Sequence, residues 1–128
     1  MSVQRQRVSS GAPWEAVAGY SRAVRAGNHV AVSGTVGRNV DGTVPAGAYA
    51  QATRAIAIID AALAEVGCGL EQVIRTRIFV TSIGDFDEVA RAHAEAFAAV
   101  RPATSMVEVS RLVDDVFLLE IEADAVIG

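Results

Sequence analysis

The chain has 128 residues, a length that suits one compact domain, and we expect residues 1–128 to form a single domain with an ordered core over about residues 20–126. Its formal net charge of -4 provides no basic surface to neutralise a phosphate backbone, so we predict no nucleic-acid partner. The apolar stretch 55–66 contains Asp60 and Glu65 and is shorter than the roughly 20 residues that cross a bilayer, so we predict no membrane segment.

The N-terminal segment and the cysteine content indicate a cytoplasmic protein. The polar start MSVQRQRVSS lacks the apolar core of a secretory signal. The single cysteine, Cys68, has no partner for an internal disulfide, and we interpret it as a buried structural thiol.

The first predicted elements are two antiparallel strands over residues 21–25 and 29–33. They flank residues 26–28, where glycine and asparagine tolerate the positive φ of a hairpin turn. Residues 9–13 before them indicate an irregular segment. Turn-forming residues 39–43, followed by Pro45, keep the chain irregular until a helix begins near Ala48.

The helix that begins near residue 48 is predicted to end at Gly67. Its apolar residues recur every three or four positions, which is the spacing of one helix face. These residues are Ala52, Ile56, Ile59, Leu63 and Val66.

A strand is predicted over residues 73–81, followed by a second helix. Side chains alternate along a strand, so Thr76 and Arg77 point to opposite faces. Asp85 and Glu88 have the spacing of a capping box at the start of the second helix, and Pro102 ends it because proline cannot extend the hydrogen-bond ladder. The apolar stripe of this helix consists of Phe86, Val89, His93, Phe97 and Val100.

Two further strands, over residues 104–109 and 116–126, complete the order ββαβαββ. This order predicts a mixed sheet with both helices packed on one face. In the final strand Glu120, Glu122 and Asp124 share one face, opposite an apolar face. Either water covers the acidic face, as in many two-layer sheets, or that face lines a subunit interface where Arg75 or Arg77 offsets some of the carboxylates.

His93 is the polar member of an otherwise apolar helix stripe. It is either a core histidine with satisfied hydrogen bonds or, if its ring reaches a cleft, an acid or base that titrates near neutrality. Neither histidine belongs to an HxH, HxxxH or CxxC spacing, so no metal site is predicted.

Several short segments follow one another between residues 19 and 123. They are GYSRAV (19–24), AGN (26–28), VSG (32–34), QATR (51–54), RTRIFVT (75–81), RPA (101–103) and EIEA (120–123). In order and spacing they resemble the signatures of the RidA/YjgF family of small imine and enamine deaminases. The resemblance implies an α+β, chorismate-mutase-like fold and a homotrimer built around a central barrel. It also implies a small-molecule substrate bound in clefts between subunits, with no cofactor.

The resemblance also implies roles for individual residues. In members with deaminase activity, an arginine after the Pro-Ala pair binds the substrate carboxylate, and a glutamate in the last strand is thought to position the attacking water. Glu120 matches that glutamate, and Tyr20 and Ser33 match residues of the same site. Thr104 stands at the position of the arginine, and its hydroxyl cannot replace a charged fork of donors.

Other positions also depart from the family pattern, since Ala90 and His93 stand where asparagine and an aromatic residue are common. We therefore expect Arg77 to supply a relocated positive charge, with His93 and Glu120 or Glu122 as acid and base. The candidate catalytic residues are Glu120 and His93, and the candidate substrate-binding residues are Tyr20, Ser33, Arg77, Thr104, Ser105, Met106 and Glu122.

The function expected on this basis is hydrolysis of a small imine or enamine metabolite. The substitution at residue 104 argues against 2-iminopropionate as the substrate. The alternative is a non-catalytic homotrimer that binds a small metabolite in the same cleft. The ribonuclease activity attached to some family names is disfavoured by the acidic balance of the chain.

Overall fold

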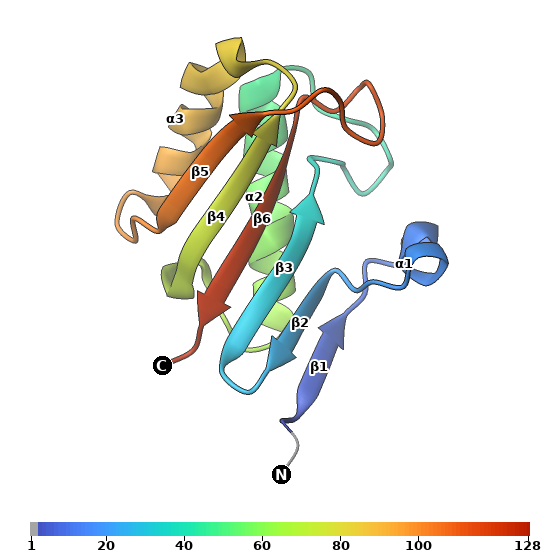
Figure 1. The fold of residues 1–128 in the computed structure, drawn as a ribbon, viewed down its shortest axis with the longest axis vertical. Coiled ribbons are helices and arrows are strands. Elements are labelled where there is room, and N and C mark those ends of the chain that lie inside the picture. The colour runs from blue at the N-terminus through green and yellow to red at the C-terminus, as the bar shows by residue number, and fades with distance from the viewer. Residues whose placement is uncertain (1–2) are drawn as a thin grey trace.

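The computed structural model, which describes residues 3–128, is built on one mixed β-sheet (Figure 1). Within these residues the strand order is β1-β2-β3-β6-β4-β5. Neighbouring strands are antiparallel except for the parallel pair β4 and β5, as the predicted mixed sheet requires. The strands are β1 (Arg5–Val8), β2 (Ala23–Ala26), β3 (His29–Thr35), β4 (Val73–Val80), β5 (Ala103–Glu108) and β6 (Leu119–Val126).

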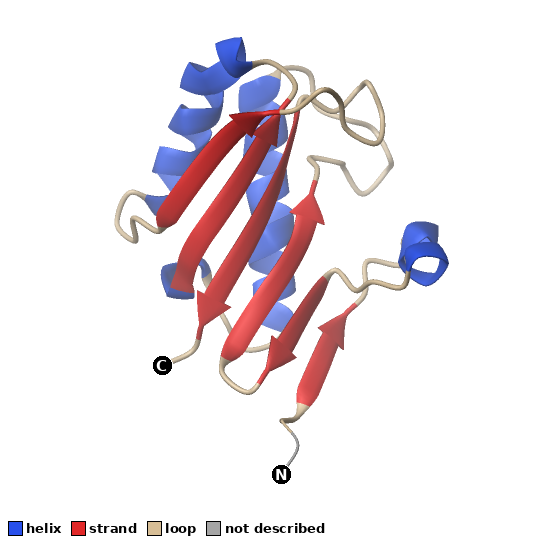
Figure 2. Ribbon diagram, in the orientation of Figure 1, coloured by secondary structure: helices blue, strands red, loops and turns tan. Residues whose placement is uncertain are grey.

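Two long helices, α2 (Ala48–Glu65) and α3 (Phe86–Phe97), cover the same face of the sheet, as Figure 2 shows. The predicted α+β arrangement with both helices on one face is therefore confirmed. The core lies between these helices and the sheet, and the apolar stripe predicted for α2 is buried throughout. In α3, Val89 and Phe97 are buried, whereas Phe86, at the first helical position, is 50% exposed.

Two elements precede residue 20, where the ordered core was expected to begin. They are β1, which pairs along its whole length with β2, and the short helix α1 (Pro13–Ala18). An edge strand is held by backbone hydrogen bonds and needs little apolar sequence, and Val8 is the residue of β1 that is buried. Neither element was therefore predicted from the sequence.

The capping box predicted at the start of α3 does not form among the described residues. Asp85 precedes the helix, but its side chain makes no capping hydrogen bond. A capping residue needs extended backbone angles, whereas Asp85 ends a 3-10 turn with φ -83° and ψ 4°. The helix ends at Phe97, earlier than the predicted end at Pro102, and residues 98–100 continue as turns. The chain then reverses through Arg101 at φ 55°, just before Pro102.

The pairing of β3 with β6 contains a β-bulge. Val32 is opposite Ala123 and Thr35 is opposite Ile121, so β3 has one more residue than β6 in this interval. The bulge therefore places Ser33 and Gly34 beside Glu122, on the side of the sheet that the long helices leave open.

Buried Gln51 of α2 fixes the loop that leads into β6. Its side chain donates to the carbonyl oxygens of Pro45 (3.1 Å) and Val116 (3.0 Å) and accepts from the amide of Leu118 (2.9 Å). This clamp holds Leu118, the residue just before β6 and two positions before Glu120. Among residues 3–128, no helix is long and apolar enough to cross a membrane.

Candidate functional site

The open face of the sheet carries the acidic residues of β6, as strand alternation predicted. Glu120 and Glu122 pair in register with Phe79 and Arg77 of β4. The intervening residues Ile121 and Ala123 are buried on the helix side. Carboxylates and a guanidinium therefore share a surface that neither long helix covers.

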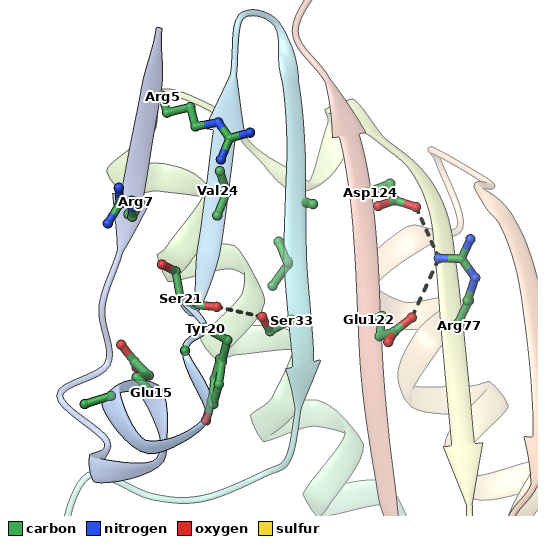
Figure 3. A pocket seen from close by; sticks show the side chains of 14 residues that line it. Arg5, Arg7, Glu15, Tyr20, Ser21, Val24, Ser33, Arg77, Glu122 and Asp124 are labelled. Carbon is green, nitrogen blue, oxygen red and sulfur yellow. Dashed lines mark hydrogen bonds and ion pairs between the residues drawn. The ribbon is translucent and has the colours of Figure 1, made fainter. Parts of the chain in front are cut away.

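Arg77 compensates two of these carboxylates. Its guanidinium lies 3.3 Å from a carboxylate oxygen of Asp124 and 3.6 Å from one of Glu122 (Figure 3). These are the ion pairs found within residues 3–128, and Glu120 takes no part in them. Glu120 is thus a carboxylate without a direct counter-ion on this face among the described residues.

The carboxylate of Glu120 packs against the backbone of Gly34 in the β3 bulge. A Cβ atom placed at Gly34 would lie 2.6 Å from Cδ of Glu120, closer than non-bonded carbons approach. The pKa of Glu120 is raised from its ordinary value by burial and by the neighbouring carboxylate of Glu122, against an opposing effect of Arg22. A raised pKa makes this side chain a better proton acceptor near neutrality.

A hollow of about 750 Å³ lies on the same face (Figure 3). Tyr20 and Ser33, both expected in the site, line it together with Arg77 and Glu122. Ser33 donates a hydrogen bond to the carbonyl oxygen of Ser21 at 2.6 Å, so its hydroxyl oxygen remains available as an acceptor.

The sequence analysis missed three charged residues that border this hollow, Arg5, Arg7 and Glu15. All three lie on β1 or α1. The alternation of Arg5 and Arg7 around Gln6, followed by apolar Val8, was the signal that could have revealed a strand with two arginines on one face.

His93 and Thr104 lie on the opposite side of the sheet, where they are joined through Thr76. Nε2 of His93 is 2.9 Å from Oγ1 of Thr76, which is 2.8 Å from Oγ1 of Thr104. Within one chain, therefore, His93 does not converge with Glu120 or Arg77. The expectation that these residues meet is wrong for a single subunit, because strand alternation places Thr76 and Arg77 on opposite faces.

The direction of these hydrogen bonds follows from counting protons. Thr104 donates to the carbonyl oxygen of Pro102 at 3.1 Å, so Thr76 donates to Thr104 and His93 donates to Thr76. Nε2 of His93 therefore carries a proton. Burial lowers the pKa of His93, which favours the neutral ring, with Nδ1 left as an acceptor.

The neighbouring residues of β5 are divided between the two faces. Ser105 is in register with Arg77 on the open face and is exposed. Met106 is in register with Ile78 and packs against the core on the helix side, so it is not on the face of the hollow.

Among residues 3–128, no group of three His, Cys, Asp or Glu side chains is placed to hold a metal ion.

The fold defines a class of small α+β proteins of which many structures are known. Rv2704 of Mycobacterium tuberculosis, a member of the YjgF/YER057c/UK114 family, superposes with a TM-score of 0.89 at 47% identity, covering 97% of this chain and all of that one. An uncharacterized protein of Streptomyces coelicolor is 41% identical over 124 residues, which are 96% of this chain and 92% of that protein.

Residues 10–127 match the family model described as Endoribonuclease L-PSP. The 2-iminobutanoate/2-iminopropanoate deaminase of Escherichia coli is 36% identical over 115 residues, or 87% of this chain and 89% of the enzyme. The chain belongs to the RidA/YjgF family.

Proposed function

We propose that this protein is a cofactor-free hydrolase that converts a small imine or enamine into a carbonyl compound and ammonia, with Glu120 as the general base. The observation that carries the proposal is the state of Glu120. Its carboxylate is half-buried, has no counter-ion within ion-pair distance among residues 3–128, and has a raised pKa. The 36% identity to a deaminase of Escherichia coli supports the same reaction class.

The chemistry requires one proton acceptor and one water molecule. Glu120 takes a proton from water as the oxygen adds to the C=N carbon and returns that proton to the nitrogen, which gives a carbinolamine. The hydroxyl proton of the carbinolamine then passes through Glu120 to the nitrogen, so that the C=O bond forms, the C–N bond breaks and ammonia leaves. An enamine enters the same sequence after protonation of its carbon converts it to the imine. One imine and one water thus give one carbonyl compound and one ammonia. The hydroxyls of Tyr20 and Ser33 line the hollow on the same face of the sheet and are available to orient the substrate, although Glu120 itself is not part of that lining.

We further propose that the active unit is a homotrimer with its site between subunits. His93, Thr104 and Met106 lie on the helix side of their own sheet, so they reach a Glu120 site only if it belongs to a neighbouring subunit. Ser105, Arg77 and Glu122 lie on the open face with Glu120 and belong to the substrate-binding set within each subunit.

The state of Thr104 limits the substrate. Its hydroxyl proton is engaged by the carbonyl of Pro102, and its oxygen accepts from Thr76. It therefore offers neither charge nor a free donor to a substrate carboxylate. We expect 2-iminopropionate to be a poor substrate.

The same observation favours a second candidate function, a non-catalytic homotrimer that binds a small metabolite. A cleft of the family's shape can still bind a small molecule without the arginine that binds the substrate carboxylate. It lacks, however, an important means of orienting an acidic substrate for reaction. The ribonuclease activity in the name of the family model has no such support, because Glu120, Glu122 and Asp124 repel a phosphate backbone on the open face.

The test generates imines in situ from a series of amino acids with an amino-acid oxidase and catalase. Semicarbazide traps the free imine, so a hydrolase lowers the yield of trapped product. We expect slow turnover of the alanine-derived imine by the wild type, partial gain in Thr104→Arg and loss in Glu120→Gln. Rapid wild-type turnover of this imine would contradict the substrate limit, and silence of all three proteins across the series would favour the binding function.

A further inference from the structure

Arg22 is a half-buried arginine between α1 and β2, on the same side of the sheet as Glu120. Its Nη2 donates to the carbonyl oxygen of Gly34 at 2.5 Å. Its Nε, by contrast, is buried and has no hydrogen-bond partner among residues 3–128. One end of the guanidinium is therefore fixed by the β3 bulge, while another of its N–H groups is left unsatisfied.

This arrangement does not favour folding. A buried N–H group without an acceptor loses its hydrogen bond to water and gains nothing in return. Burial also lowers the pKa of Arg22, which means that the surroundings disfavour its charge. An uncharged side chain of similar length would avoid both costs but would give up the hydrogen bond to Gly34. Burial of Arg22 itself therefore does not explain an arginine at this position, whereas its contact with Gly34 does.

Gly34 connects Arg22 to the candidate base. The carbonyl oxygen of Gly34 accepts from Arg22, and Glu120 packs against the Cα atom of the same glycine. No direct ion pair joins Arg22 to Glu120 within the described chain. The backbone of Gly34 is the structural link between the two side chains.

The other charged groups around Glu120 do not replace this cation. Glu122, two residues away on β6, raises the pKa of Glu120, whereas Arg22 lowers it. Arg77 on β4 is engaged by Glu122 and Asp124. Tyr20 and Glu15 also act on the charge of Arg22, but Glu15 accepts hydrogen bonds from Ser9 and Ser10.

We propose that Arg22 is a positioning residue of this site, which fixes the Gly34 bulge beneath Glu120 and keeps that carboxylate ionised near neutral pH. The catalytic consequence rests on the proposed function of Glu120. The effect of Arg22 on the pKa of Glu120 does not depend on that function, since it can be measured in the protein without substrate.

The experiment is an NMR titration of protein carrying ¹³C-labelled glutamate side chains, with the Glu120 signal assigned from Glu120→Gln. Arg22→Met keeps the length of the side chain without its charge, and we expect it to raise the pKa of Glu120 by about half a unit to one unit. Arg22→Lys keeps the charge and is expected to restore the wild-type pKa. Arg25→Met is the matched control, because Arg25 lies on β2 but donates to the carbonyl oxygen of Val66 at the end of α2.

A role in folding alone predicts a different pattern. If Arg22 is a positioning residue, the pKa of Glu120 rises in folded Arg22→Met, even where loss of the hydrogen bond to Gly34 lowers the midpoint of denaturation. If Arg22→Met does not fold, Arg22→Gln gives the same test, because its amide can still donate to Gly34 but carries no charge. An unchanged pKa of Glu120 in the folded variant, or an equal rise in Arg25→Met, overturns the proposal.

Kinetics separate this proposal from the proposed function. In an active protein, Arg22→Met shifts the acidic limb of the kcat/KM profile upward in pH by the same amount as the NMR titration, and Arg22→Lys restores it. If the pKa of Glu120 rises in Arg22→Met but no protein hydrolyses an imine, the role of Arg22 stands and the proposed hydrolase function is contradicted. If imines are hydrolysed but the pH profile is the same in Arg22→Met and the wild type, the hydrolase function stands and the role of Arg22 is contradicted.

Discussion

Thr76 and Thr104 hold their hydroxyl oxygens 2.8 Å apart across the parallel pair of β4 and β5. Because His93 donates to the same Thr76 oxygen, His93 and Thr104 are joined through one buried hydroxyl. These two residues, both candidates for the site, are therefore parts of one local arrangement.

The first prediction concerns this buried hydroxyl. Thr76→Val keeps the shape of the side chain but leaves Nε2–H of His93 without its acceptor, so we expect the free energy of unfolding to fall by about 1–2 kcal/mol. Thr104→Val is the control, with a smaller expected loss because residue 104 is exposed and water can replace its hydroxyl. Chemical denaturation measures both. Equal losses in the two variants would contradict the expectation that burial makes the hydrogen bonds of Thr76 contribute more to stability than those of Thr104.

The second prediction concerns pH. Burial lowers the pKa of His93 in the folded protein, so between the folded and unfolded pKa values the unfolded chain binds more protons. The stability associated with neutral His93 is present above the unfolded pKa of about 6.5 and is lost as pH falls through the folded pKa. His93→Phe removes this titration. As the pH is lowered from 7.5 to 5.5, we expect the free energy of unfolding to fall more steeply in the wild type than in His93→Phe. Parallel curves for the two proteins would contradict a lowered pKa of His93 in the folded protein.

The third prediction separates the position of Glu120 from the stability of the fold. In Gly34→Ala the new methyl group occupies space held by the flexible end of Glu120, so the carboxylate must move. We expect imine turnover to fall by about tenfold or more, with less than about 1 kcal/mol lost from the free energy of unfolding. Gly84→Ala is the matched control, since a Cβ there meets only Ser82 Oγ at 3.4 Å. An unaltered Glu120 signal in ¹³C spectra of Gly34→Ala would show that the contact is not restrictive.

The fourth prediction concerns assembly. If the open face lies between three subunits, light scattering coupled to size-exclusion chromatography gives a mass of about 40 kDa, three times the 13.3 kDa of one chain. The same measurement at raised salt concentration is a useful control. Salt screens charge pairs buried in an interface less than charge pairs at its exposed rim, so a trimer held by buried pairs keeps its mass. A stable monomer of full activity would remove the basis for an intersubunit site.

Much of the sheet was predictable because burial on one face imposes alternation. The pattern of residues 73–81 and 116–126 placed Thr76 opposite Arg77 and put Glu120 and Glu122 on an open face, as the structure has them. The pairing of Arg77 with acids of the last strand follows from the same alternation.

The register between strands was not predictable, because it depends on contacts between distant segments. Alternation within residues 104–109 could not reveal that Thr104 shares the helix side with Thr76. For the same reason the sequence suggested that His93 meets Glu120, whereas the sheet lies between them. The approach of Glu120 to Gly34 depends on a bulge, which alternation does not encode.

That bulge means that the resting place of the Glu120 carboxylate depends on one supernumerary residue in β3. A one-residue deletion at Gly34 is expected to restore regular pairing between Val32 and Thr35 and to remove the gap in which the carboxylate rests. Regular pairing and this seat for the carboxylate are thus alternatives at one codon, so the order of the strands can be kept while the candidate base is displaced.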